Sequence, residues 1–369
     1  MNKPLSYITF FKGNKKTSTM YILTLVIAIL ILGITKIILS SSSNEMEVSI
    51  QRAEKLTEMQ LLYTDDADSA SMLASGEVIK KVRALDSVQS VLPAKRFVST
   101  FRYFIGASES KNYFLRREDA IKLLDCLGVS YNENDLPNEG DNKAFISQRA
   151  AINAGLNLGD KILQNVDVTV DKTFISEFPI SVIPTDIPDN SDSYIIIPKP
   201  DRLAEMNIDI QNIVNDNFEL RDYKYNKNRI ETMQKSAEDT FFIILIIVTF
   251  ACSITTGITT YIHYYNRRKE IGIMKAIGYS DKRIVMRITK EVCISTISAL
   301  LISLALIVVT ICVLNVAIAN TNGFVAFEFD YSVFLNIIVI PIFMGIFSLV
   351  PTWAMLRTMD KITLIQRGY

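Results

Sequence analysis

The 369-residue sequence is poor in the side chains that most often perform catalysis or bind metal ions. It contains one histidine and four cysteines. His263 lies at the end of an apolar segment, where a lone histidine is more often a boundary residue than a base or a ligand. Only Cys126 lies outside the apolar segments, so no disulfide is expected within its domain, and no CxxC or His/Cys metal set occurs. These absences predict no catalytic site and no metal site.

Motifs for nucleotide or ion handling are missing as well. No GxxxxGK[ST] phosphate loop occurs, so no cofactor is expected on this chain. The apolar segments hold no Asp, Glu or Arg in their middles, although ion-coupled carriers usually need such groups. The acidic pairs Asp65/Asp66 and Glu118/Asp119 have no histidine or nucleophile beside them and are interpreted as solubilising. The sequence therefore predicts no enzyme, and favours a mechanical part driven from elsewhere or a sensor.

Long apolar runs, in contrast, are abundant. Four segments reach the length of about 20 residues that a membrane-spanning helix needs. They are Met20–Leu39, Phe241–Tyr265, Val292–Ala319 and Ser332–Leu356, and the only charge within them is Lys36. No small-residue cleavage site follows the first segment, so we interpret it as a retained anchor rather than a signal peptide. The predicted fold class is a membrane protein with four transmembrane α-helices.

The charges between these segments predict their orientation. Four lysines and no acid precede the first segment, and residues 266–290 hold eight Lys and Arg against two acids. Residues 320–331 hold two acids and no base. Because positive flanks mark the cytoplasmic side, both termini and residues 266–290 are predicted to be cytoplasmic. The predicted location is the bacterial cell membrane, with several crossings.

The neutral overall charge conceals two bodies of opposite sign. Residues 41–240 hold 23 Lys and Arg against 33 Asp and Glu, a net charge of −10, which leaves +10 for the remainder. The basic part is short and membrane-bound, so nucleic-acid binding is not expected. The predicted organisation is a cytoplasmic segment 1–19, transmembrane helix 20–39, extracytoplasmic α+β domain 40–240 with helical stalks, transmembrane helix 241–265, cytoplasmic coupling loop 266–290, transmembrane helix 291–319, short outer loop 320–331, transmembrane helix 332–356 and cytoplasmic tail 357–369.

Both ends of the large outer domain carry apolar residues at helical spacing. The pattern covers Met46–Leu62 and Ile230–Phe241, with steps of three or four. We interpret these as stalk helices that continue out of the membrane, although the run Ser40–Ser43 could break the first; two ordinary helices of the outer domain are the alternative. Further helices are expected at Glu77–Ala84, Arg116–Leu127 and from a Ser147 cap to Gly155, and strands at Ser87–Leu92, Phe97–Ile105, Lys161–Val170, Phe178–Ile183 and Tyr194–Ile197.

The basic loop 266–290 has an internal pattern of its own. Ile271, Ile273 or Met274, and Ile277 recur at helical spacing, and Gly278 is well placed to end a helix. A short amphipathic helix at the inner membrane face would offer a surface to a soluble partner. A solvated turn that carries only topology-setting charges is the alternative.

These features together resemble the FtsX-like/MacB-type ABC transporter permeases. Their order is one span, a large outer domain and then three spans, with RRKEIGIMKAIGYS at Arg267–Ser280 after the second span. This block is the most specific part of the resemblance. Phe11–Ile34, Ala144–Ile162 and Pro351–Ile365 are similar to further segments of the family.

The resemblance implies a permease subunit that works by mechanotransmission. Because this chain carries no ATPase, it implies separate ABC ATPase subunits that bind ATP, together with a second permease, identical or different, and surrounding membrane lipid. Isoleucines of a coupling helix would insert into the ATPase, while Lys269, Glu270 and Lys275 set the register by charge. The implied ATPase-coupling residues are Lys269, Glu270, Gly272, Ile273, Lys275, Ala276, Ile277 and Gly278.

Three functions remain open from the sequence. The first is export or extraction of a peptide, a lipid or another amphiphile. The second is an FtsX-like regulator that transmits the state of the ATPase to an extracytoplasmic adaptor or effector, such as a cell-wall hydrolase, without transport. The third is a stand-alone sensor, which leaves the Arg267–Ser280 block unexplained.

Overall fold

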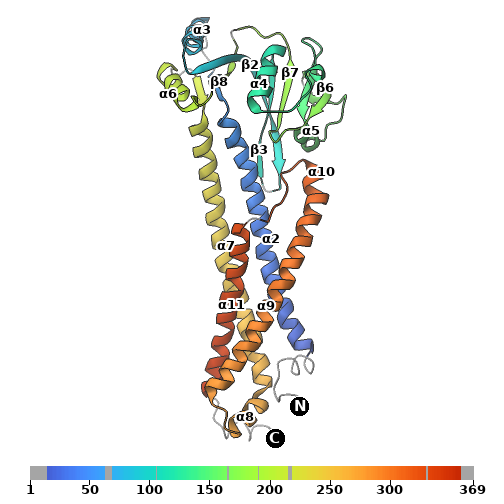
Figure 1. The fold of residues 1–369 in the computed structure, drawn as a ribbon, viewed down its shortest axis with the longest axis vertical. Helices are drawn as coiled ribbons and strands as arrows, with labels where there is room; N and C mark the ends of the chain where they lie inside the picture. Colours follow the sequence, from blue (N-terminus) through green and yellow to red (C-terminus); the bar gives the residue numbers. More distant parts are fainter. Residues whose placement is uncertain are drawn as a thin grey trace. The chain divides into compact units, whose positions relative to one another are not determined.

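A computed structural model describes residues 15–62, 69–104, 106–163, 166–189, 191–214, 218–329 and 331–358. The chain divides into two compact units (Figure 1). The membrane unit lies within Met1–Ser40, Ala237–Leu314 and Phe327–Tyr369, and the outer domain lies within Ser41–Ser236 and Asn315–Ala326.

A mixed sheet forms the centre of the outer domain. In the described residues it has nine strands in the order β5-β6-β4-β7-β3-β2-β8-β1-β9. The pairs β3–β7 and β4–β6 are parallel and the other pairs are antiparallel. The strands are β1 (Thr57–Leu61), β2 (Val88–Tyr103), β3 (Gly106–Leu115), β4 (Lys143–Ser147), β5 (Lys161–Leu163), β6 (Val166–Phe174), β7 (Ile180–Pro184), β8 (Ser193–Pro198) and β9 (Phe218–Arg221).

Four helices pack on this sheet: α3 (Ser69–Arg83), α4 (Arg117–Leu127), α5 (Gln148–Ala154) and α6 (Leu203–Ile213). The buried residues of α4 include Ala120, Leu123, Leu124 and Leu127, which share one helix face that packs against β7. Helix α5 begins where the Ser147 hydroxyl accepts a hydrogen bond from the Ala150 amide at 3.4 Å. Local capping and apolar periodicity therefore explain both helices, and the predictions at Arg116–Leu127 and from Ser147 to Gly155 are confirmed. The third predicted helix, Glu77–Ala84, overlaps the second half of α3, which begins earlier, at Ser69.

The membrane unit is helical. Its elements are the greater part of α2 (Lys15–Ala53) and of α7 (Tyr223–Asn266), the short α8 (Arg268–Ala276), α9 (Asp281–Leu314) and α11 (Tyr331–Thr358). Within the described residues, three segments are long and apolar enough to cross a membrane: Ile22–Ala53, Tyr223–Asn266 and Asp281–Asn322. The fourth predicted span lies inside α11, and its crossing of the membrane stays a prediction.

Two predictions at the ends of the outer domain have different outcomes. Helix α7 includes Ile230–Phe241, as predicted for the second stalk, and α2 continues through Ser40–Ser43 without a break. The first stalk was predicted to reach Leu62, which is wrong, because α2 ends at Ala53 and Thr57–Leu61 is strand β1. Met59 and Leu61 also fit a two-residue period, and pairing with β8 on one side and β9 on the other selects the strand.

Two further strand predictions need correction. The separate strands predicted at Ser87–Leu92 and Phe97–Ile105 are one continuous strand, β2, because β8 pairs with its first part and β3 with its second. The strand predicted at Lys161–Val170 is a hairpin of β5 and β6. Strands β3, β4 and β9 and helix α6 were not predicted. Strands β4 and β9 pair with partners that are distant in sequence, whereas β3 pairs with the preceding strand β2.

Candidate functional site

Helix α8 forms an elbow that joins α7 to α9. One face of α8 packs into a small apolar cluster with residues from both longer helices. The buried members of the cluster are Tyr264, Ile271, Met274, Ile284, Ile288 and Val292. The amphipathic helix predicted within residues 266–290 is therefore present, and this cluster holds one of its faces.

The opposite face of α8 presents apolar side chains to the surroundings. Ile273 is 58% exposed and Ile277 is 72% exposed. Exposed large apolar residues beside polar ones are typical of surfaces that bind a partner. Because Ile271 and Met274 fill the internal cluster, only Ile273 and Ile277 remain available for the insertion that the family resemblance implies.

The turn after α8 depends on a glycine. Gly278 has a φ of 99°, a conformation that residues with a side chain rarely adopt. Its amide donates to the Lys275 carbonyl at 3.1 Å, and the Tyr279 amide donates to the Met274 carbonyl at 3.0 Å. Gly278 thus ends the helix and directs the chain into α9.

The predicted charged residues of α8 have different environments. Lys269 is exposed, whereas both oxygens of Glu270 accept hydrogen bonds from Arg267. The side chain of Lys275 is 6% exposed, and its Nζ lies 2.9 Å from Asp281 Oδ1. Lys275 therefore secures the start of α9, which does not fit its predicted place in a contact surface. Gly272 is buried, and Ala276 is exposed beside the two isoleucines.

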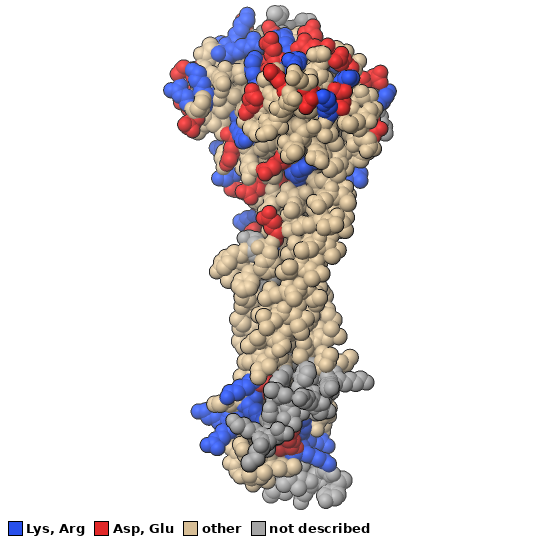
Figure 2. Space-filling model, turned by 45° about the vertical axis from the view of Figure 1, so that its right-hand side comes forward, with Lys and Arg blue, Asp and Glu red and all other residues tan. Residues whose placement is uncertain are grey.

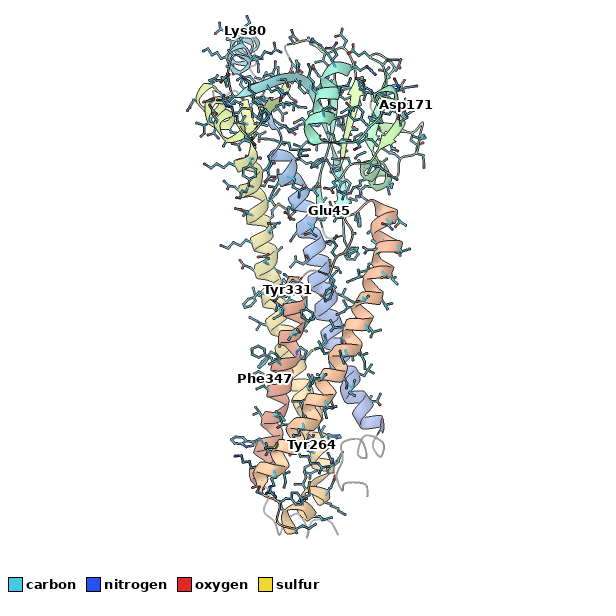
Figure 3. The ribbon with its side chains drawn as sticks, in the orientation of Figure 1. Glu45, Lys80, Asp171, Tyr264, Tyr331 and Phe347 are labelled. Atoms are coloured by element: carbon cyan, nitrogen blue, oxygen red, sulfur yellow. The ribbon has the colours of Figure 1, made fainter. Side chains whose placement is uncertain are left out.

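A buried carboxylate at the elbow was missed by the sequence prediction. Glu291 Oε2 accepts from Arg267 Nη1 at 2.8 Å and from the Tyr264 hydroxyl at 3.0 Å (Figure 3 labels Tyr264). Arg287 Nε lies 3.8 Å from Glu291 Oε1, which has no hydrogen-bond partner among the described residues. We call Tyr264, Arg267, Arg287 and Glu291 the inner node. The sequence signal for it was a single acid between the basic loop 266–290 and the apolar segment that begins at Val292.

The outer domain contains a second buried carboxylate with a related set of partners. Glu58 Oε1 accepts from Arg52 Nη2 at 3.1 Å and from the Tyr113 hydroxyl. Glu58 Oε2 accepts from Arg96 Nη1 at 2.9 Å and from Lys111 Nζ at 2.6 Å. We call these five residues the outer node; it ties the end of α2 to strands β1, β2 and β3.

The outer node also shifts the proton affinities of its members. Burial would raise the pKa of the Glu58 carboxyl, but the charges of Lys111 and Arg52 and the hydrogen bonds from Lys111 and Tyr113 outweigh it and hold that pKa well below its usual value. Burial and the nearby positive charge of Arg52 lower the pKa of Lys111 to about 8, although Glu58 opposes them. Glu58 is therefore charged throughout the physiological range.

The loop that follows the short helix α10 (Asn320–Asn322) is clamped within the outer domain. Arg149 Nη2 lies 2.6 Å from Glu45 Oε1, and Arg149 Nε donates to the Gly323 carbonyl at 3.0 Å. The Val325 amide donates to the same Glu45 oxygen at 2.5 Å. A Cβ added at Gly323 would lie 2.6 Å from the Arg149 carbonyl oxygen, so the close approach requires glycine. These contacts fix residues 323–325 against α5 and the end of α2 that belongs to the outer domain.

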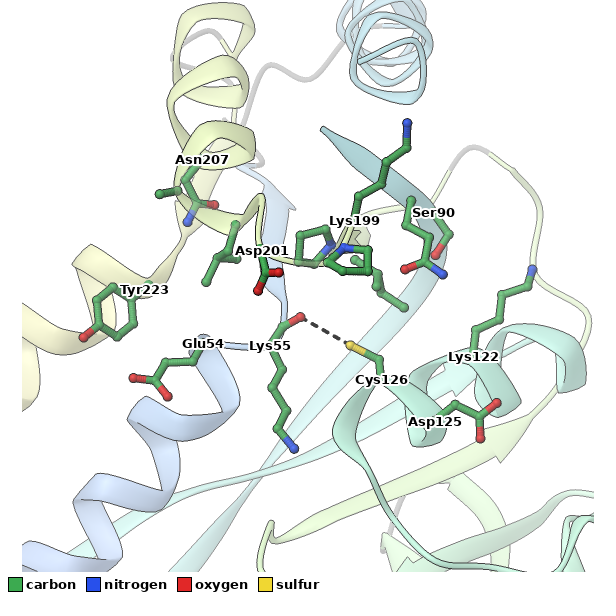
Figure 4. Close-up of a pocket in the computed structure, with 16 residues that line it drawn as sticks. Glu54, Lys55, Ser90, Lys122, Asp125, Cys126, Lys199, Asp201, Asn207 and Tyr223 are labelled. Atoms are coloured by element: carbon green, nitrogen blue, oxygen red, sulfur yellow. Dashed lines mark hydrogen bonds between the residues drawn. The ribbon is translucent and has the colours of Figure 1, made fainter. Parts of the chain in front are cut away.

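A cavity of about 1110 Å³ opens in the outer domain (Figure 4). Its wall combines three lysines, three acids and an apolar part that includes Ile197, Pro198 and Leu203. Cys126 lines it, and its thiol donates to the Lys55 carbonyl at 3.3 Å. Burial raises the pKa of this thiol, which makes it a poor nucleophile. The charged members of the wall are Lys55, Lys122, Lys199, Glu54, Asp125 and Asp201.

The remaining chemistry-bearing residues form no constellation. Among the described residues, no group of three or more His, Cys, Asp or Glu could hold a metal ion. His263 packs edge-on against the ring of Tyr264 at the end of α7, with ring centres 5.0 Å apart.

Part of the chain matches the model of a known family. Residues 242–361 match the family model described as FtsX-like permease C-terminal. No curated protein matches the sequence. The periplasmic region of MacB from Actinobacillus actinomycetemcomitans is similar in structure, with 12% identity, a TM-score of 0.27, and 48% of this chain and 92% of that chain covered. The extracellular domain of the noncanonic ABC-type transporter YknZ from Gram-positive bacteria is similar with 14% identity, a TM-score of 0.27, and 45% and 100% covered.

The family match covers the elbow. Helix α8, the inner node and the Arg267–Ser280 block all lie inside residues 242–361. Residues 242–361 are therefore similar to the FtsX-like permease C-terminal domain, and the predicted resemblance to FtsX-like permeases is confirmed by this match.

Proposed function

We propose that this chain is the permease subunit of an ABC transporter that works by mechanotransmission. Separate ATPase subunits would dock on α8, and their nucleotide-driven movement would pass through the helices of the membrane unit to the outer domain. A second permease, identical or different, would complete the assembly. FtsX-like permeases are non-enzymatic membrane components, and ATP would bind to the partner subunits alone.

One observation carries this proposal. Ile273 and Ile277 are the exposed apolar residues of a helix whose other face is held by the internal cluster and the inner node. Because α8 is packed firmly against its neighbours, a displacement of α8 also displaces α7 and α9. Two exposed isoleucines can fill a groove on a partner. The exposed Lys269 adds a charge beside them.

The lining of the cavity in the outer domain favours one class of transported molecule. Its wall carries charges of both signs beside prolines and aliphatic side chains. Such a lining suits a peptide, whose backbone and side chains offer donors, acceptors and apolar groups, better than a bare acyl chain. We therefore favour a peptide among the predicted amphiphiles.

The coupling role can be tested by substitution on α8. Ile273→Asp and Ile277→Asp should each reduce co-purification of the ATPase in mild detergent by about tenfold or more, because a buried hot-spot contact is worth about 2 kcal/mol or more. Both side chains are exposed, so the yield of folded permease should stay unchanged. Lys282→Asp, another exposed residue of the same segment, is the matched control.

The outcomes separate the candidate functions. If both isoleucine variants retain the ATPase and full output, the assignment of α8 as a coupling helix is wrong. If the ATPase co-purifies with the wild type, stimulation of ATP hydrolysis by added peptide supports transport. Stoichiometric capture of an extracytoplasmic effector without such stimulation supports the regulator instead.

A further inference from the structure

A second, smaller cavity lies beside the elbow in the membrane unit. Its volume is about 270 Å³, below the range of about 300–1,000 Å³ that is usual for sites of drug-sized ligands. Three cations line it, Arg283, Arg287 and Lys290, with Tyr279 at its side and methionine and isoleucine side chains behind them. A cavity of this size suits a small anionic group.

The charges around this cavity are not balanced within the described part of the chain. Glu291 accepts from Arg267 and Tyr264 through Oε2, and its Oε1 lies 3.8 Å from Arg287 Nε, too far for a hydrogen bond. Arg287 Nη2 is buried and has no hydrogen-bond partner among the described residues. Asp281, the other acid at the start of α9, pairs with Lys275. Among the described residues, the cavity therefore holds an excess of positive charge and one N–H donor, Arg287 Nη2, that has no acceptor.

The same face of α9 continues as an apolar stripe. Arg283, Arg287 and Lys290 are followed at steps of three or four by Ile294, Ile297 and Leu301. These three apolar side chains are all exposed, and they lie in a helix that is long and apolar enough to cross a membrane. Cations followed by an exposed apolar stripe match a molecule with an anionic head and an aliphatic tail.

The depth of the cations agrees with this arrangement. At 1.5 Å per residue, Lys290 and Arg287 lie about 3 and 8 Å before Val292, the start of the predicted span. The polar layer on each side of a bilayer is about 5–8 Å thick, so both side chains reach the level of lipid phosphates. Figure 2 shows Lys and Arg gathered at the end of the apolar membrane unit.

We propose that the cavity formed by Tyr279, Arg283, Arg287 and Lys290 binds the phosphate of an anionic phospholipid, whose acyl chain lies along Ile294, Ile297 and Leu301. An oxygen of the bound phosphate accepts a hydrogen bond from Arg287 Nη2, and this contact holds the elbow at the membrane surface. This proposal requires that α9 crosses a membrane, but it is independent of whether α8 binds an ATPase.

The test uses the full-length protein in nanodiscs of phosphatidylcholine with increasing phosphatidylglycerol, and native mass spectrometry counts the lipids retained. The double variant R283Q/K290Q removes two exposed cations of the cavity. The control K269Q/K282Q removes two exposed cations of the same segment that do not line it. The wild type and the control should retain one phosphatidylglycerol. R283Q/K290Q should retain it about 25-fold less, since each of the two cations contributes about a factor of five near an anionic lipid surface.

Each other result would overturn the proposal. Equal losses in the two double variants would mean that any cation of the loop suffices and that there is no site. Equal stabilisation of the wild type by inorganic phosphate in pure phosphatidylcholine would identify a site for soluble phosphate. Loss of a co-purifying ATPase from R283Q/K290Q with unchanged lipid retention would identify an ATPase contact surface.

Discussion

The outer and inner nodes are built from the same parts but are satisfied to different degrees. Each places a buried glutamate beside arginines and a tyrosine hydroxyl. Both oxygens of Glu58 accept two hydrogen bonds, so the outer node is saturated. Only Oε2 of Glu291 is bonded, and its Oε1 and Arg287 Nη2 have no partner among the described residues.

This difference in hydrogen bonding agrees with the roles that we propose for the two units. A saturated buried network fixes one arrangement, because any displacement leaves charges uncompensated. The outer node thus makes the end of α2 and three strands one rigid body. A half-satisfied node can rearrange at smaller cost or accept a further group, which agrees with the proposed docking of an ATPase at the elbow and with the proposed lipid phosphate.

The largest effect should come from Glu58→Gln. Without the carboxylate charge, Arg52, Arg96 and Lys111 remain buried together, and breaking a buried ion pair costs about 3–5 kcal/mol. Hydrogen exchange of the β1 and β3 amides in the full-length protein should report this loss of local stability. Glu205→Gln, at an exposed pair with Arg202, should change it by less than about 0.5 kcal/mol. If hydrogen exchange in Glu58→Gln changes as little as in Glu205→Gln, the outer node is not the rigid network that distinguishes it from the inner node.

The pH dependence should come from the same carboxylate. Because its folded-state pKa is depressed, Glu58 contributes stability that is fully present above its unfolded pKa of about 4.5 and is lost as the pH falls further. The thermal midpoint of the outer domain, followed by circular dichroism from pH 7 to pH 3, should fall more steeply in the wild type than in Glu58→Gln. Parallel curves would show that Glu58 does not carry the acid sensitivity.

A smaller effect is expected for Glu291→Gln. The amide oxygen can still accept from Tyr264 or Arg267, so the cost is that of one weakened charged hydrogen bond, about 1.5–3 kcal/mol. Hydrogen exchange in α8 and the first turns of α9 should rise, while the outer strands stay unchanged. If this variant is as destabilised as Glu58→Gln, the inner node is as rigid as the outer one.

The smallest pair of effects compares the two tyrosines. Tyr113→Phe removes one donor to Glu58 and leaves three cations in place, so it should cost about 1 kcal/mol. Tyr264→Phe should cost no more, because the other Glu291 oxygen can turn toward Arg267. Hydrogen exchange of the β3 and α8 amides measures the two losses of local stability. A larger loss of stability in Tyr264→Phe than in Tyr113→Phe would contradict the expectation that the outer node is the more rigid one.

Three candidate spans and three outer helices could be predicted because the signals are local. Apolar length predicted the three spans, and Ser147 with Gly155 predicted α5. The orientation predicted from lysines and arginines stays a prediction. The amphipathic pattern of the 266–290 loop predicted α8, including the isoleucines that turned out to be exposed. It did not reveal which charged residues face inward. The position of Lys275 on the helix does not show that Asp281, beyond the following turn, pairs with it.

By itself, the sequence determined where helices can cross a membrane, where charge accumulates and where a glycine must end α8, because each follows from neighbouring residues. Only the tertiary structure decided that Thr57–Leu61 is a strand, that Glu58 meets Lys111 and that Glu291 meets Arg267. A strand is chosen by the partners beside it, and a buried charge is tolerated only where distant groups converge on it. Both depend on contacts between residues that are far apart along the chain.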